Sequence, residues 1–157
     1  MSSKARKLDA SRVINAPARK IFAFLARPDN HVLLDTSGMI RGSADHATMT
    51  EMGAVFAMNM HNEMKGDHQV ENHVVVYEPD RASGWAPAEP GHQPAGHTWV
   101  WRLAPIADNR TLVTQTYDWS AFSHAEMLDH LPVINHDQLQ ASLDRLAEAV
   151  DDQAGAP

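Results

Sequence analysis

The chain has 157 residues, 43% hydrophobic and 21% charged, which is the balance of one globular domain and excludes a disordered or fibrous protein. Its formal net charge is −7 with neutral histidines, which argues against binding to nucleic acid because such a field repels polyanions. The absence of cysteine excludes disulfides, thiolate metal ligands and cysteine nucleophiles.

The same features predict one domain over 1–157 in the cytoplasm, with an ordered core over about 7–150 and a frayed end after it. The basic cluster at the start is not followed by an apolar segment, so it does not read as a secretory signal. No run approaches the roughly 20 apolar residues of a membrane span, and we therefore expect no insertion into a membrane.

The first predicted elements are a strand and two short helices. Residues 8–15 end in β-branched residues and suit a half-buried strand. Pro17 then fits the first turn of a helix over 17–27, because proline is favoured at that position. A second short helix is expected to start at residues 28–30, to carry Val32, Leu33 and Leu34, and to end near Ser37 and Gly38.

The middle of the chain predicts an antiparallel meander, because short alternating runs are separated by turn residues. The expected strands are 39–44, 54–62, 69–77, 82–86, 97–103 and 112–119. Residues 87–96, with three prolines and two glycines, are expected to form a loop, either a cover for a cavity mouth or a plain surface excursion.

Helical patterns return near the end of the chain. Ser123 and Glu126 have capping-box spacing and predict a helix start, with Pro132 kinking or dividing that helix. From Asn135 onward, leucines and a valine recur at helical spacing and predict one long helix with a continuous apolar stripe. The stripe consists of Leu139, Leu143, Leu146 and Val150.

Three stretches, 11–31, 74–85 and 101–120, resemble parts of the START/polyketide-cyclase (SRPBCC) superfamily in the same order. They read SRVINAPARKIFAFLARPDNH, VVVYEPDRASGW and WRLAPIADNRTLVTQTYDWS. The resemblance implies an α+β helix-grip fold, in which a curved antiparallel sheet of about seven strands wraps around a long C-terminal helix. One departure is the segment HVLLD over 31–35, where many relatives have tryptophan.

The resemblance also implies an apolar cavity between the sheet and the last helix, and strand parity indicates which residues would line it. Methionine and aromatic side chains on these faces suit a flat or irregular apolar ligand, although such stripes are also common in plain cores. The predicted ligand-binding residues are Phe56, Met58, Met60, Trp99, Trp101, Tyr117, Trp119, Leu139 and Leu143.

Candidates for acid–base chemistry are Asp118, His61, His73 and His97, none with a partner that the sequence identifies, so no catalytic residue is assigned. The ten histidines are scattered without metal-ligand spacing. No GxSxG elbow and no glycine-rich phosphate loop is present, and we expect no cofactor and no metal.

The leading functional prediction is binding or transport of a small hydrophobic molecule: a lipid, a polyketide or an aromatic metabolite. One alternative is a polyketide aromatase/cyclase-like or dehydratase-like enzyme that uses the same cavity. Another is a co-chaperone-like protein-interaction module. The sequence leaves open the ligand, the oligomeric state and whether any reaction is catalysed.

Overall fold

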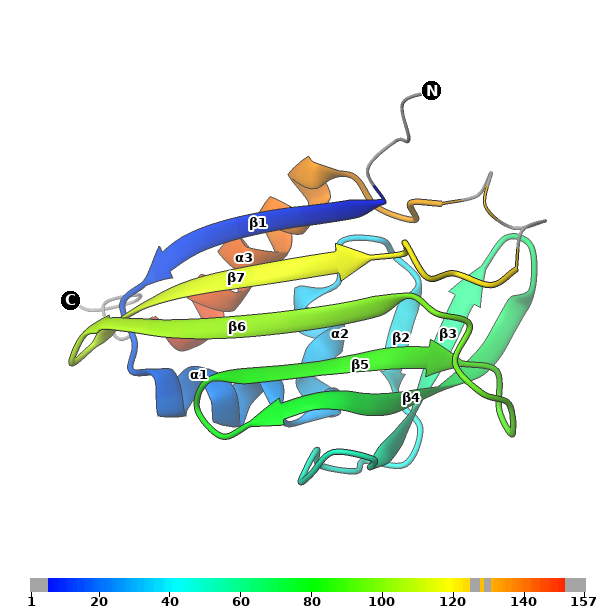
Figure 1. The fold of residues 1–157 in the computed structure, drawn as a ribbon, viewed down its shortest axis with the longest axis horizontal. Helices are drawn as coiled ribbons and strands as arrows, with labels where there is room; N and C mark the ends of the chain where they lie inside the picture. The colour runs from blue at the N-terminus through cyan, green and yellow to red at the C-terminus, as the bar shows by residue number, and fades with distance from the viewer. Residues whose placement is uncertain (1–5, 125–127, 129–130, 152–157) are drawn as a thin grey trace.

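The computed structural model describes residues 6–124, 128 and 131–151, and its main element is a seven-stranded antiparallel sheet (Figure 1). The strand order is β1-β7-β6-β5-β4-β3-β2, so the only non-sequential neighbours are β1 and β7. The strands are β1 (Lys7–Ile14), β2 (Ile40–Ser43), β3 (Val55–Asn62), β4 (Gly66–Glu78), β5 (Ala82–Ala88), β6 (Thr98–Ala107) and β7 (Arg110–Asp118).

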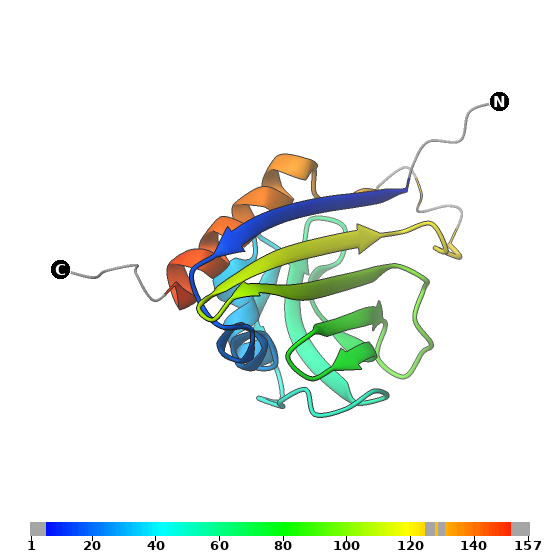
Figure 2. The same cartoon turned by 60° about the vertical axis from the view of Figure 1, so that its left-hand side comes forward.

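The helices lie on one side of this sheet, which curves around them (Figure 2). They are α1 (Ala18–Leu25), the 3-10 turn η1 (Pro28–Asn30), α2 (His31–Leu34) and α3 (His136–Val150). This is the predicted α+β helix-grip arrangement: one strand, two short helices, six strands and a long last helix. The prediction of the fold class is therefore confirmed.

Helix α3 begins at a reciprocal cap. The Asn135 side chain accepts a hydrogen bond from the Gln138 backbone N–H at 2.9 Å, and the Gln138 side chain accepts one from the Asn135 N–H at 2.8 Å. Gln138 is also tied to the segment after α2, because the Thr36 hydroxyl donates to its carbonyl at 2.8 Å. The predicted stripe of α3 is buried along its whole length.

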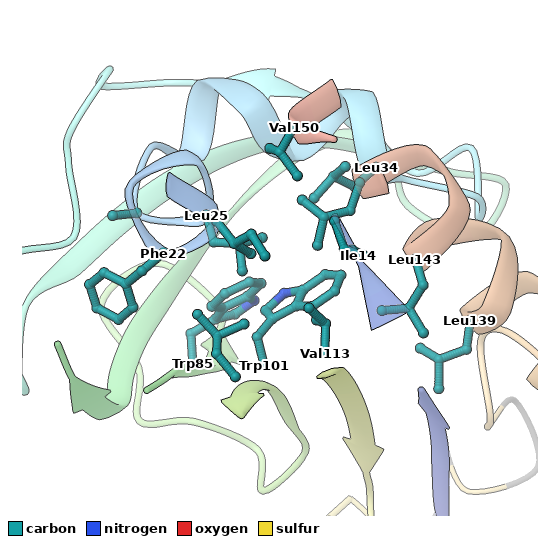
Figure 3. Packing of buried hydrophobic residues seen from close by; sticks show 14 of the residues in the cluster. Ile14, Phe22, Leu25, Leu34, Trp85, Trp101, Val113, Leu139, Leu143 and Val150 are labelled. Atoms are coloured by element: carbon teal, nitrogen blue, oxygen red, sulfur yellow. The ribbon is translucent and has the colours of Figure 1, made fainter. Parts of the chain in front are cut away.

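The core lies between the concave face of the sheet and the helices. Directly opposed residues of antiparallel strands share a face, and Trp101 of β6 stands opposite Ser83 of β5 and Gln115 of β7. Figure 3 shows Trp85 on the side of Leu25 of α1, and Trp101 and Val113 on the side of Ile14 and Leu143. We call the face that carries these side chains the concave face.

The predicted loop over 87–96 is wrong at its beginning, because β5 runs to Ala88 and Pro87 pairs with Asn72 of β4. Proline is tolerated there because the paired residues of β5 and β6 reach only to Trp85, so no ladder on that side needs an N–H from residue 87. Several strands are also longer than predicted: β4 starts at Gly66 and β6 continues to Ala107.

The helix predicted to start at Ser123 depends on Glu126, which lies outside the described residues. Among the described residues, the Ser123 hydroxyl donates to the Ala95 carbonyl at 2.9 Å. Residues 131–135 are not helical. Within the described ranges, no helix has the length and apolar character needed to cross a bilayer.

Candidate ligand-binding site

The structure brings the nine predicted ligand-binding residues to the concave face and to the facing stripe of α3. Seven of them are buried: Phe56, Met58, Trp101, Tyr117, Trp119, Leu139 and Leu143. Met60 and Trp99 are half-buried and pack at the margin of the core. The strand parity read from the sequence therefore holds, while the role of these residues in binding a ligand stays a prediction.

Helix α3 lies close to only one part of the sheet. It packs mainly along β1 and against α2, whereas the middle strands curve away from it (Figure 2). Bulky side chains, above all Trp85 and Trp101, extend from those strands into the space between the layers (Figure 3). The fold thus places wide side chains on strands that do not pack directly against α3.

Two hollows lined by described residues lie outside this space. One, of about 710 Å³, is bordered by the start of α1 and by the β4–β5 and β6–β7 turns. The other, of about 720 Å³, lies near the β3–β4 hairpin, and of the nine predicted residues it includes Met60. A cavity between the sheet and α3 remains the prediction of the fold resemblance.

An aromatic cluster occupies one end of the concave face. The rings of Trp99 and Tyr117 are stacked, with centroids 3.9 Å apart and planes within 1°, and Trp119 lies 4.9 Å from Tyr117. Burial raises the pKa of Tyr117 to about 12. Its phenol therefore stays protonated at neutral pH and can serve as a hydrogen-bond donor, but it is a weak general base.

A second aromatic cluster contains a residue that the sequence reasoning missed, His31 of α2. Its imidazole stacks on Trp85 at 4.7 Å and meets the edge of Phe56 at 5.7 Å. Its Nε2–H donates to the Leu25 carbonyl at 2.8 Å, and burial lowers its pKa to about 4, so the ring is neutral at pH 7. The only signal in the sequence was the departure at 31–35 from the tryptophan of many relatives.

Three buried polar side chains on the concave face were also missed: Asn72, Ser83 and Gln115. In the described part of the chain, the Asn72 Oδ1, the Ser83 Oγ and the Gln115 Oε1 have no hydrogen-bond partner. The signal for Gln115 was present, since it stands between Val113 and Tyr117, which parity had placed on one face. Such oxygens mark places where a bound polar group would gain a hydrogen bond.

The four candidates for acid–base chemistry are not assembled into a pair on the concave face. Asp118 accepts hydrogen bonds from the Ser120 N–H at 2.8 Å and the Ser120 hydroxyl at 2.6 Å, which is a turn contact. His61 contacts Asp67 at 2.7 Å at the exposed β3–β4 hairpin.

The other two candidates are histidines with one unpartnered ring nitrogen each. His73 stands opposite Val55 and Ala86, on the convex side of the sheet, and its Nε2 is buried. His97 lies 5.4 Å from the ring of Phe122, and burial lowers its pKa to about 4. Neither histidine has a carboxylate to orient it among the residues described, so these side chains provide no acid–base pair.

No family model matches this chain. Among curated proteins it is similar to the uncharacterized protein Rv0088 of Mycobacterium tuberculosis, with 28% identity over 116 residues. The match includes 73% of this chain and 48% of that protein, so the chain spans about half the length of the curated relatives it matches.

Solved structures of similar fold cover nearly the whole chain. Protein CV1439 from Chromobacterium violaceum aligns with a TM-score of 0.64 and 17% identity, covering 93% of this chain and 97% of that one. The Aha1 dimer from Colwellia psychrerythraea gives 0.58 and 18%, covering 95% and 98%. The Polyketide_cyc-like protein Cgl2372 from Corynebacterium glutamicum gives 0.52 and 18%, covering 94% and 85%. These likenesses show an SRPBCC/Aha1-like, polyketide cyclase-like fold.

Proposed function

We propose that this chain binds a small hydrophobic molecule between the concave face of the sheet and α3, as a carrier or sensor. The observation that supports this most is the distance of α3 from the middle strands, where the space is spanned by wide aromatic side chains. A ligand that moves these side chains apart replaces contacts between aromatic rings with its own apolar contacts. Each Å² of apolar surface that binding removes from water contributes about 25 cal/mol of favourable free energy.

The composition of the concave face supports a ligand with flat apolar surfaces. Trp85, Trp99, Trp119 and Tyr117 offer broad rigid faces, and Met58 and Met60 can adapt their shape to an irregular guest. The acid–base candidates stand apart from one another, which favours binding over catalysis. The fold alone is compatible with either role.

The test is direct binding of 1-aminoanthracene, a neutral dye whose fluorescence rises in apolar surroundings, with native mass spectrometry to count bound molecules. We expect one dye per chain and micromolar affinity. Trp119→Ala should weaken binding several-fold, because it removes an aromatic wall. The matched control is Ile106→Ala, which shortens an exposed side chain on the β6–β7 side and should leave affinity unchanged.

Two results would count against this function. One is the absence of any bound dye together with no rise in melting temperature when the dye is present, since a ligand that binds only the folded chain must stabilise it. The other is dye binding with the same affinity in Trp119→Ala as in Ile106→Ala, which would place the site away from Trp119.

A further inference from the structure

The concave face carries polar side chains whose burial the fold alone does not explain. Gln115 is 6% exposed and Ser83 is 2% exposed, and neither the Gln115 Oε1 nor the Ser83 Oγ has a hydrogen-bond partner in the described residues. A buried oxygen without a partner destabilises the fold relative to one that is bonded. An apolar residue of similar size would avoid that cost at either position.

These two residues flank one tryptophan. Ser83 and Gln115 are the direct neighbours of Trp101 on β5 and β7, so their Cα atoms are separated by two strand spacings, about 10 Å. On its other side Gln115 stands opposite Ala10 of β1, whose methyl group fills little of the interior. The Gln115 amide therefore lies beside a small neighbour, in the layer between the sheet and α3.

Aromatic side chains lie next to Gln115 along β7 and next to Ser83 along β5. Tyr117 follows Gln115 by two residues on the same face and stacks on Trp99, and Trp85 follows Ser83 by two residues. In Figure 3 the nitrogen-bearing edges of Trp85 and Trp101 lie toward each other. A group that both donates and accepts hydrogen bonds would thus meet suitable partners here, next to flat apolar walls.

The interior offers nothing to balance a charge. None of the described Lys, Arg, Asp or Glu residues is buried. Arg12, at the margin of the concave face, is bound to Asp144 of α3 at 2.7 Å. His31 is neutral at pH 7 because burial lowers its pKa. A carboxylate or phosphate placed in this layer would lose its hydration without gaining a counter-charge, which is strongly unfavourable.

We propose that the ligand is a neutral, flat apolar molecule bearing a hydroxyl group, and that this hydroxyl donates a hydrogen bond to the Gln115 Oε1, on the β7 side of Trp101. This inference rests on the proposed function and specifies its ligand class. It separates hydroxylated aromatic or polycyclic compounds from pure hydrocarbons, which leave the Gln115 oxygen unpaired, and from fatty acids, which bring an uncompensated charge.

The experiment uses three probes of one shape: 2-naphthol, 2-methoxynaphthalene and 2-naphthoate, each titrated into the full chain at pH 7 by calorimetry. The first donates a hydrogen bond, the second only accepts, and the third is an anion. We expect 2-naphthol to bind roughly 5- to 10-fold more tightly than 2-methoxynaphthalene, the effect of one net hydrogen bond. We expect 2-naphthoate to bind most weakly.

Substitution then assigns the preference to the concave face. Gln115→Met should bring the two neutral probes to within about twofold of each other, while 2-methoxynaphthalene retains its affinity. Ser83→Ala, on the other side of Trp101, should change the preference less than Gln115→Met does. The control Thr114→Val alters the residue before Gln115, which lies on the opposite face of the same strand. It should preserve the wild-type ratio of the affinities for 2-naphthol and 2-methoxynaphthalene.

The comparison of the three probes uses the unsubstituted chain, so it does not depend on any variant folding. The other possible results would each contradict part of the inference. Equal affinities for the two neutral probes would overturn the hydroxyl recognition and leave the proposed function standing. Tightest binding of 2-naphthoate would overturn the requirement for a neutral ligand. If none of the three naphthyl probes binds, the inference fails, and the 1-aminoanthracene titration decides separately whether the proposed function stands.

Discussion

Replacing Gln115 by methionine should stabilise the ligand-free chain. The substitution keeps the side-chain length, removes an oxygen that is buried without a partner, and places a flexible apolar group beside Trp101 and Ala10. Recovering a desolvation cost of about 1–3 kcal/mol should raise the free energy of unfolding by about 1 kcal/mol or more. For a chain of this length, 1 kcal/mol corresponds to about 2–4 °C in melting temperature.

Urea unfolding measures this change, since a shift of the midpoint at constant slope reports stability alone. The control is Gln93→Met, the same chemical change at an exposed residue of the β5–β6 loop, where the effect should lie within about 0.5 kcal/mol. A loss of more than about 1 kcal/mol in Gln115→Met would refute the reasoning, because it would mean that the amide makes stabilising hydrogen bonds in the folded chain.

Two further predictions concern the helices and pH. Asn135→Ala removes the side chain that caps α3 and should cost about 1 kcal/mol in urea unfolding, whereas Asn135→Ser should recover most of it; equal losses in both would contradict a capping role. Acid should destabilise the fold, because burial lowers the pKa of His31 to about 4 from an ordinary value near 6.5. As the pH falls, the unfolded chain takes up the His31 proton before the folded chain does. The contribution of His31 to the free energy of unfolding is therefore fully present above pH 6.5 and falls by up to about 3 kcal/mol toward pH 4. His31→Phe should flatten this slope between pH 7.5 and 5, with His97 producing the remainder, and an unchanged slope would contradict the assignment.

Local sequence patterns were sufficient to predict most of the helices and strands and the face on which their buried side chains lie. The spacing of Leu139, Leu143, Leu146 and Val150 predicted a buried helix face, and all four side chains are buried. Alternation along β3, β6 and β7 placed Met58, Trp101 and Tyr117 on the correct face. These features depend on helical and strand periods that short windows of sequence express directly.

What the sequence did not reveal depends on contacts between distant segments. His31 becomes an interior residue because α2 brings it onto Trp85, 54 positions along the chain, and the ring is held by the Leu25 carbonyl. Whether the Gln115 Oε1 and the Ser83 Oγ are paired depends on the side chains of adjacent strands, and none of the described ones donates a hydrogen bond to either oxygen. The continuation of β5 through Pro87 depends on where its pairing with β6 stops.

The bond from Thr36 to Gln138 joins segments 102 residues apart at the amino end of α3. A second bond runs from the Gln138 side chain to the Thr36 carbonyl at 3.2 Å, and Arg145, about two turns further along α3, donates to the carbonyl of Asp35. Helix α3 is thus hydrogen-bonded at several points to residues 35–36, which follow α2. Moving α3 away from this backbone would break several hydrogen bonds at once, so α3 is anchored at both its first and its third turn.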